Sequence, residues 1–308
     1  MEDQDIPGTL MVELADDMHT IITEPVLIAN GPDTCKGTGF EDHPAFEASS
    51  IRHIGDWYYY VYSSLQGHEL CYAMGKKPEG PFTYKGVLIS NADLGYKGNI
   101  LPTNYYGNNH GGLEKIGDKV YVFYHRHTHG TEFSRQGCAE EVHILDDGTI
   151  DQAEVTSCGL NGGPLKAEGM YPAYIACHIT GPDRSKVGHV INPGPRSADS
   201  IQIPEEIPYV TEEGEKENLK PYIHNLRKGS MAGFKYFRFE EESHAVLECR
   251  GHGTVVILAG GEVIGEIPFD KDEWCLKSIK IKVLRGTYAV YAEIKEGVLD
   301  LAQIGFLK

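Results

Sequence analysis

Three histidines alternate along one predicted strand of the sequence. They are His125, His127 and His129, within the segment KVYVFYHRHTH. Because successive side chains of a strand point to opposite faces, the three imidazoles are predicted to share one face. Neutral imidazoles can bind zinc there, but no nearby carboxylate has ligand spacing and the segment runs into a turn. We keep a zinc centre as the alternative and expect structural histidines.

The seven cysteines show no spacing typical of a metal site or a disulfide framework. Their number is odd and none forms a CxxC pair, which argues against a cysteine-based zinc site. We expect reduced thiols, as in a cytosolic protein. The first residues, MEDQDIPGTL, have neither the basic nor the apolar part of a signal peptide, so we expect a cytoplasmic location.

The sequence predicts that short strands carry these side chains. Turn signals such as IGD and KPEG separate segments rich in β-branched and aromatic residues, and no amphipathic helix is evident. The predicted class is therefore all-β. The N-terminal segments of this kind are GTLMVEL, IITEPVLI, WYYYVYSS, HELCYAMG, FTYKGVLI, KVYVFYHRH and AEEVHIL.

Two segments resemble each other. Residues 50–62 read SIRHIGDWYYYVY and residues 113–124 read LEKIGDKVYVFY. Each predicts a strand, a tight turn and an aromatic strand, and they recur at a spacing near one propeller blade. This favours the radially repeated blades of a β-propeller, with two unrelated hairpins of a sandwich as the alternative.

The strand pattern divides the chain into three parts. Residues 1–180 are predicted to form a partial β-propeller, because a blade needs about 40–45 residues and this part has room for about three. Residues 181–220 are rich in Pro, Gly, Ser and Glu and are predicted to be a connector. Residues 221–308 carry a second set of short strands, which indicates an antiparallel β-sandwich.

The composition limits the partners. The 308 residues carry a formal net charge of −17, with 41% hydrophobic and 24% charged residues. Such an acidic surface repels phosphate backbones and anionic lipids, so we expect neither nucleic acid nor membrane as a partner. A neutral sugar remains compatible with this charge.

Two motifs carry a resemblance to a known family. FEASSIR at 46–52, followed by GDWYY at 55–59, resembles the general-acid blade of family 43 glycoside hydrolases. NNHGG at 108–112, followed by FYHR at 123–126, resembles the next blade of that family, where a histidine lies on the propeller axis near an ion or water. The resemblance implies a five-bladed β-propeller of which this chain has a part.

Further segments extend the resemblance to the end of the chain. SRQGCAE at 134–140, closing with DGTI at 147–150, is a third match in the right order. YIHNL at 222–226 and AGFKYF at 232–237 resemble a carbohydrate-binding-module-6-like sandwich. In that sandwich Trp274 and Tyr236 are candidates for a sugar platform, or for packing against the propeller.

The resemblance implies an inverting hydrolysis of terminal α-L-arabinofuranosyl or β-D-xylosyl linkages in plant polysaccharide fragments. Such a reaction needs two carboxyl groups roughly 6.5–9.5 Å apart, one protonating the leaving oxygen and one activating a water. Glu47 matches the general acid, whose pKa would have to be raised by burial or a neighbouring carboxylate.

Other residues take roles by the same resemblance. His110 is expected to hold a structural calcium or sodium ion on the axis through water, and the reaction itself requires no cofactor. Arg135 is expected to hydrogen-bond sugar hydroxyls with its forked donors. Aromatic side chains that could stack on the oligosaccharide are Phe46, Trp57 and Tyr124.

The sequence departs from the family pattern at its front. The catalytic base of the family is an aspartate in the first blade, and none of Asp3, Asp5, Asp16 and Asp17 has that setting. We expect a second chain or an N-terminal fragment to complete the propeller. The alternative is a non-catalytic carbohydrate-binding protein, or one subunit of a split propeller enzyme.

Overall fold

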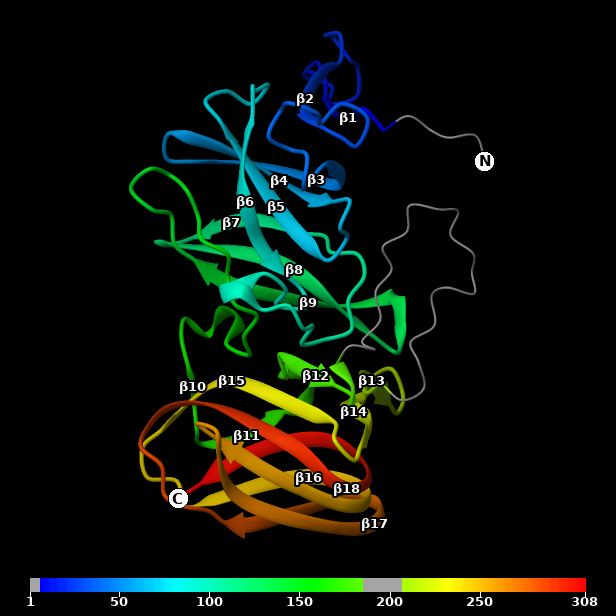
Figure 1. Cartoon of the computed structure of the whole chain (residues 1–308), viewed down its shortest axis with the longest axis vertical. Coiled ribbons are helices and arrows are strands. Elements are labelled where there is room, and N and C mark those ends of the chain that lie inside the picture. Colours follow the sequence, from blue (N-terminus) through cyan, green and yellow to red (C-terminus); the bar gives the residue numbers. More distant parts are fainter. Residues whose placement is uncertain (1–5, 185–206) are drawn as a thin grey trace.

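The computed structural model describes residues 6–184 and 207–308, so residues 185–206 of the predicted connector lie outside it. The predicted all-β class is confirmed, with sheets stacked along the long axis of the molecule from β1 and β2 at one end to β16–β18 at the other (Figure 1). Short 3₁₀ turns also occur among the described residues, namely η1 (Tyr96–Gly98), η2 (Gly159–Asn161) and η3 (Ala173–Ile175). Within the described residues no helix is long and apolar enough to cross a bilayer.

Three antiparallel sheets make up the N-terminal part. A two-stranded sheet precedes a four-stranded meander in the order β3-β4-β5-β6 and a three-stranded meander in the order β7-β8-β9. The strands are β1 (Gly8–Met11), β2 (Val26–Asn30), β3 (Ala45–Ile54), β4 (Trp57–Ser64), β5 (Glu69–Gly75), β6 (Thr83–Ser90), β7 (Gly112–Ile116), β8 (Lys119–Thr128) and β9 (Thr131–Val142).

The two similar segments form equivalent hairpins. Ile54 pairs with Trp57 across one turn, and Ile116 pairs with Lys119 across the other. Gly55 and Gly117 have φ values of 60° and 63°, the left-handed conformation that two-residue hairpin turns require. The predicted repeat is therefore real at the level of the backbone, and each hairpin opens one blade-like sheet.

Apolar side chains pack these sheets face to face. One cluster joins the two meanders through residues such as Tyr59 and Leu70 of the first and Val122 of the second. A second cluster, which includes Ile28 and Tyr60, joins the first meander to β2. Stacked sheets joined through such cores are the arrangement of successive propeller blades.

The C-terminal part is a sandwich whose long strands bend between its layers. β18 pairs with β15 along its first half and with β14 along its second. Its core contains Phe234, Phe237 and Phe306. The strands are β10 (Leu165–Lys166), β11 (Gly169–Pro172), β12 (His178–Thr180), β13 (Tyr209–Glu213), β14 (Lys220–Arg227), β15 (Met231–Phe239), β16 (His244–Ala259), β17 (Glu262–Lys280) and β18 (Gly286–Leu307).

The sandwich takes strands from outside the range 221–308. β10 and β12 pair with β15, and β11 pairs with β18, although residues 165–180 fall in the part predicted as propeller. β13, from the predicted connector, pairs with β14. These short segments gave no strand signal of their own because only pairing with the longer strands makes them extended.

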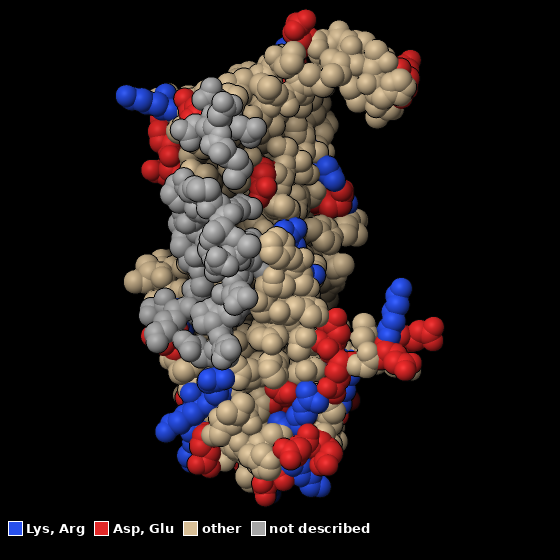
Figure 2. Space-filling model, turned by 90° about the vertical axis from the view of Figure 1, so that its right-hand side faces the viewer, with Lys and Arg blue, Asp and Glu red and all other residues tan. Residues whose placement is uncertain are grey.

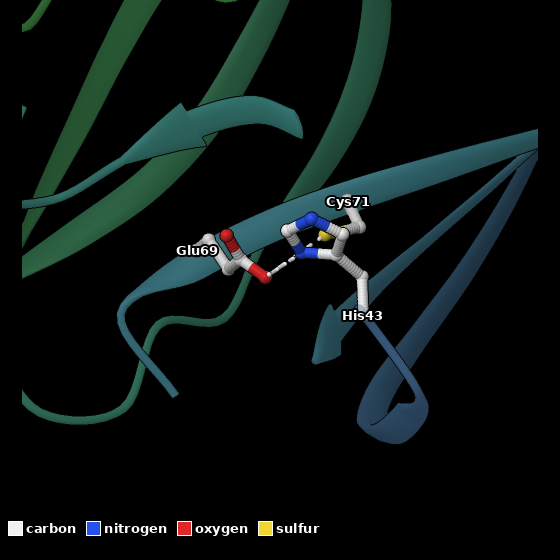
Figure 3. Close-up of side chains that lie close together, drawn as sticks. All are labelled: His43, Glu69 and Cys71. Atoms are coloured by element: carbon white, nitrogen blue, oxygen red, sulfur yellow. Dashed lines mark hydrogen bonds and ion pairs between the residues drawn. The ribbon is translucent and has the colours of Figure 1, made fainter. Parts of the chain in front are cut away.

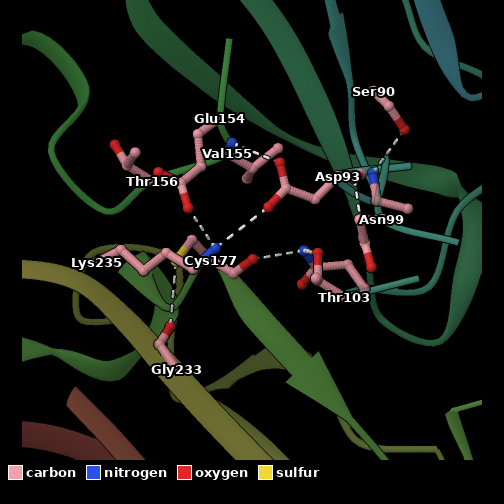
Figure 4. A network of polar contacts seen from close by, with 12 residues as sticks. Ser90, Asp93, Asn99, Thr103, Glu154, Val155, Thr156, Cys177, Gly233 and Lys235 are labelled. Atoms are coloured by element: carbon pink, nitrogen blue, oxygen red, sulfur yellow. Dashed lines mark hydrogen bonds and ion pairs between the residues drawn. The ribbon is translucent and has the colours of Figure 1, made fainter. Parts of the chain in front are cut away.

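A buried polar network joins the two parts (Figure 4). The Lys235 Nζ of β15 lies 3.2 Å from Asp93 Oδ2 and 2.9 Å from Glu154 Oε1. The Tyr236 hydroxyl donates to Glu154 Oε2 at 2.8 Å. The Tyr236 side chain is therefore engaged at the joint, in agreement with packing rather than with a sugar platform.

Candidate active site

Glu47 lies on β3 at a break in the strand register. Glu47 pairs with Ser63, whereas Ser50 pairs with Val61, so β3 carries extra residues relative to β4. Ala48 within this bulge has a φ of 60°, which is rare for a residue with a side chain. Bulges and strained backbone often re-aim a side chain at a functional site. The bulge and the left-handed Ala48 therefore set the direction of the Glu47 carboxyl group.

The structure brings Glu47 and His110 together. Glu47 Oε1 and His110 Nε2 are 3.0 Å apart, and their side chains are 39% and 35% exposed. The next residue, Gly111, allows this approach: a Cβ there would lie 1.9 Å from the carbonyl oxygen of Phe123 in β8. Two residues that are 63 positions apart in the sequence therefore form a hydrogen bond that is accessible to solvent.

Two further histidines stand beside this pair. The ring centroids of His110 and His125 are 5.5 Å apart, and those of His125 and His127 are 5.6 Å apart. Burial lowers the pKa of His125 to about 3 and that of His127 to about 4, so both imidazoles are neutral near pH 7.

His129 does not join them. β8 ends at Thr128, and His129 has a φ of 58° at the turn and contacts Glu212 at 2.8 Å. The prediction that the three histidines share one face of a strand is therefore wrong for His129, because β8 ends one residue before it. Over residues 6–184 and 207–308, the only group of three ligand-type side chains with atoms within 4.8 Å of one another lies elsewhere, at His43, Glu69 and Cys71.

Several buried polar atoms near His110 have no hydrogen-bond partner. They are both ring nitrogens of His125, Nδ1 of His127 and Oδ1 of Asn91. Such atoms suit ordered water or a cation held through water. Calcium bound directly prefers six to eight oxygen ligands, which this mixed set does not provide. The predicted axial ion therefore fits here only through water.

A cavity of about 540 Å³ opens beside His110 on one face of the β8–β9 hairpin. The predicted residue Tyr124 lines it, and its buried hydroxyl donates to Glu140 at 3.2 Å. Arg126 and Gln136 line it as well, and neither is among the site residues predicted from the sequence. Arg126 is buried and donates to the carbonyl oxygen of Ala176, and a buried arginine inside an aromatic strand has no distinctive sequence signal.

Glu140 is a second carboxyl group near this cavity. It accepts hydrogen bonds of 2.6 Å from both the backbone N–H and the hydroxyl of Thr156. Burial raises the pKa of Glu140 to about 7. Both oxygens of the Glu140 carboxyl group therefore accept hydrogen bonds from other residues of the protein.

The remaining predicted residues lie at different distances from Glu47. Arg135 is exposed on β9 and pairs with His127, and its charge contributes to the lowered pKa of His127. Phe46 is partly buried and precedes Glu47 on β3. Trp57 lies at the other end of the β3–β4 hairpin, about 20 Å along the strand from Ser63, and packs under Lys76. The structure therefore places Arg135 beside the histidines and keeps Trp57 away from Glu47.

Trp274 of the sandwich contacts charged side chains. Its Nε1 donates to Glu213, and the cationic groups of Lys220 and Arg250 lie 4.4 and 4.5 Å from its ring centroid. The ring therefore takes part in cation–π contacts within the sandwich.

Comparisons with known proteins agree with this description. No protein-family model matches the chain. A xylosidase/arabinosidase of Thermoclostridium stercorarium is 41% identical over 298 residues, which cover 94% of this chain and 61% of that protein. A xylosidase/arabinosidase of Bacteroides ovatus is 36% identical over 91 residues, or 29% of this chain and 28% of that protein.

Two solved structures are similar to this chain at low sequence identity. A family 43 arabinoxylan arabinofuranohydrolase from Bacillus subtilis covers 97% of this chain and 59% of its own, at 16% identity and a TM-score of 0.46. A family 6 carbohydrate-binding module from Clostridium stercorarium covers 48% of this chain and 98% of its own, at 14% identity and a TM-score of 0.35.

The chain combines stacked blade-like sheets, a carboxylate at a strand bulge and an appended sandwich. The similarity along 94% of the chain confirms the predicted resemblance to family 43 glycoside hydrolases. The chain spans 61% of the length of its Thermoclostridium stercorarium relative.

Proposed function

We propose that the chain carries the general acid of an inverting glycoside hydrolase acting on terminal α-L-arabinofuranosyl or β-D-xylosyl linkages. The observation that carries the proposal is the Glu47 carboxyl group, aimed by a bulge and bonded to His110 at 3.0 Å. The names of the relatives support the substrate class.

In this reaction Glu47 starts protonated and gives its proton to the leaving glycosidic oxygen as the bond to the anomeric carbon breaks. A water attacks that carbon from the opposite side after losing a proton to a base. His110 Nε2 is the group that stabilises the resulting Glu47 carboxylate, because a ring N–H can donate to it. Arg135 would bind sugar hydroxyls, and His110 and His125 would hold an axial ion through water if one binds.

The base is proposed to come from a second polypeptide segment. Asp17 accepts bonds from the backbone of His19 and Thr20, so its carboxyl group is engaged within its own turn. The β1–β2 end exposes large apolar side chains and projects from the body as a mainly uncharged surface (Figure 2). These side chains are Leu10, Leu14, Met18, Ile21, Ile22, Val26 and Leu27.

Such an apolar face suits a further blade-like sheet that packs as the first meander packs on β2. That sheet would carry the aspartate base and complete the sugar pocket. Without it the chain binds oligosaccharide but does not hydrolyse it, which is the second candidate function.

The proposal is tested by release of arabinose from an α-L-arabinofuranosyl-substituted xylo-oligosaccharide and of xylose from xylobiose, because a sugar hydroxyl must be protonated by the general acid as it leaves. The chain is assayed alone and together with the part of the Thermoclostridium stercorarium relative that lies outside the matched region. We expect turnover in the mixture and its loss in the mixture containing Glu47→Gln. Turnover that survives Glu47→Gln would remove Glu47 as the acid.

A further inference from the structure

A second cluster of chemically active side chains contains neither Glu47 nor His110. It consists of His43, in the segment before β3, with Glu69 and Cys71 of β5 (Figure 3). We propose that these three side chains form a binding site for a soft divalent cation of the zinc type. The site is independent of the proposed glycosidase chemistry.

The backbone places the three ligands side by side. Glu69 and Cys71 are two residues apart on one strand, so their side chains share a face. His43 Nδ1 lies 2.6 Å from Glu69 Oε1, and Cys71 Sγ lies 3.3 Å from the same oxygen. One potential ligand atom of each residue lies within 4.8 Å of the others.

The surroundings hold this arrangement in place. The imidazole of His43 is stacked on the ring of Tyr84, with centroids 5.1 Å apart and planes 13° apart. The Ser64 hydroxyl donates to Glu69 at 2.5 Å, as a partner behind a metal-binding carboxylate commonly does. The ligands are therefore fixed before any ion arrives.

An ion has a route to the site from one side. The side chain of His43 is 27% exposed, whereas that of Glu69 is 5% exposed and Cys71 is fully buried. A cation would enter past the partly exposed imidazole and take water as its fourth ligand. Three protein ligands and one water are the arrangement of an open tetrahedral zinc site.

The ligand types select the kind of ion. One thiolate, one imidazole and one carboxylate suit zinc or cobalt, whereas calcium and magnesium require oxygen ligands. Ligand atoms about 2.0–2.3 Å from a tetrahedral ion lie roughly 3.3–3.8 Å from one another. The contact between Sγ and Oε1 already fits, and the His43 ring must retreat by under about 1 Å.

Protons compete with the ion for these ligands. The hydrogen bond to Glu69 raises the pKa of His43, and burial raises the pKa of the Cys71 thiol. Other titratable groups interact with these ligands. Asp42 interacts electrostatically with His43, and His68 interacts with Glu69. Tyr62 and Tyr84 interact with Cys71.

Cobalt(II) is the probe for this site. The metal-free 308-residue chain is titrated with cobalt(II), and the visible and near-ultraviolet spectra are recorded. We expect tetrahedral d–d bands together with a thiolate-to-cobalt charge-transfer band, both displaced by zinc. The matched control is Cys35→Ser, a partly buried cysteine outside the cluster, and it should keep both bands.

Two variants separate ligation from folding. Cys71→Ser should abolish the charge-transfer band, and His43→Gln, at a partly exposed position, should weaken binding at least tenfold while keeping the far-ultraviolet circular dichroism spectrum of the unmodified chain. The proposal is overturned if the unmodified chain gives no charge-transfer band, or if the band persists unchanged in folded His43→Gln.

Discussion

The candidate site depends on a few residues whose contacts reach far along the chain. The motifs around Glu47 and His110 could be recognised in the sequence, but not their hydrogen bond, because it forms only when two sheets pack together. The left-handed Ala48 and the buried Arg126 have no sequence signal either, since alanine and arginine are ordinary in strands and on surfaces.

Glu140 makes a prediction about stability and pH. Its pKa is about 7 in the folded protein against an ordinary 4.5, so the folded state binds the proton more tightly. The stability from this group is fully present below pH 4.5 and is lost as the pH rises to about 7. In Glu140→Gln the side chain does not titrate, so the unfolding free energy of this variant does not decrease for this reason.

Chemical denaturation of both proteins at several pH values measures the effect. The unfolding free energy of the unmodified chain minus that of Glu140→Gln should fall by about 1–3 kcal/mol over this window. His125 and His127 act with the opposite sign, because their lowered pKa values favour the fold at higher pH, but both proteins contain them. A difference that stays constant or rises with pH contradicts the assignment.

At the scale of elements, the glycines of NNHGG fix how closely β7 and the segment before it approach β8. A Cβ at Gly111 would lie 1.9 Å from the backbone oxygen of Phe123, so Gly111→Ala should destabilise the fold by about 2–4 kcal/mol. Thermal unfolding followed by circular dichroism measures this change. Gly137→Ala is the control, since a Cβ there meets no atom within 4 Å. Equal melting temperatures of the two variants would refute this account.

The strand elements themselves were largely predictable. The IGD turns at 54–56 and 116–118 predicted the two hairpins because tight turns need a left-handed residue, and Gly supplies it. The short strands at 165–166, 169–172 and 178–180 were not predicted as part of the sandwich. Their extended form comes from pairing with β15 and β18, which no local pattern reveals.

At the scale of the whole molecule, the joint between the two parts rests on Lys235. Lys235→Met leaves the carboxyl groups of Asp93 and Glu154 without their buried partner, so we expect a loss of about 3–5 kcal/mol in unfolding free energy. Urea unfolding measures it. Lys282→Met removes an exposed ion pair with Glu262 and should change little. A similar, small effect of both substitutions would mean that the joint does not depend on this cluster.

We propose that Glu47 is the general acid of a site completed by a second polypeptide segment. The most direct measurement is the initial rate of arabinose and xylose release from unactivated oligosaccharides by the chain mixed with the unmatched part of its Thermoclostridium stercorarium relative, compared with the same mixture containing Glu47→Gln. We predict turnover only in the first mixture, and none with the chain alone. Equal rates in the two mixtures, or full activity of the chain alone, would contradict the account.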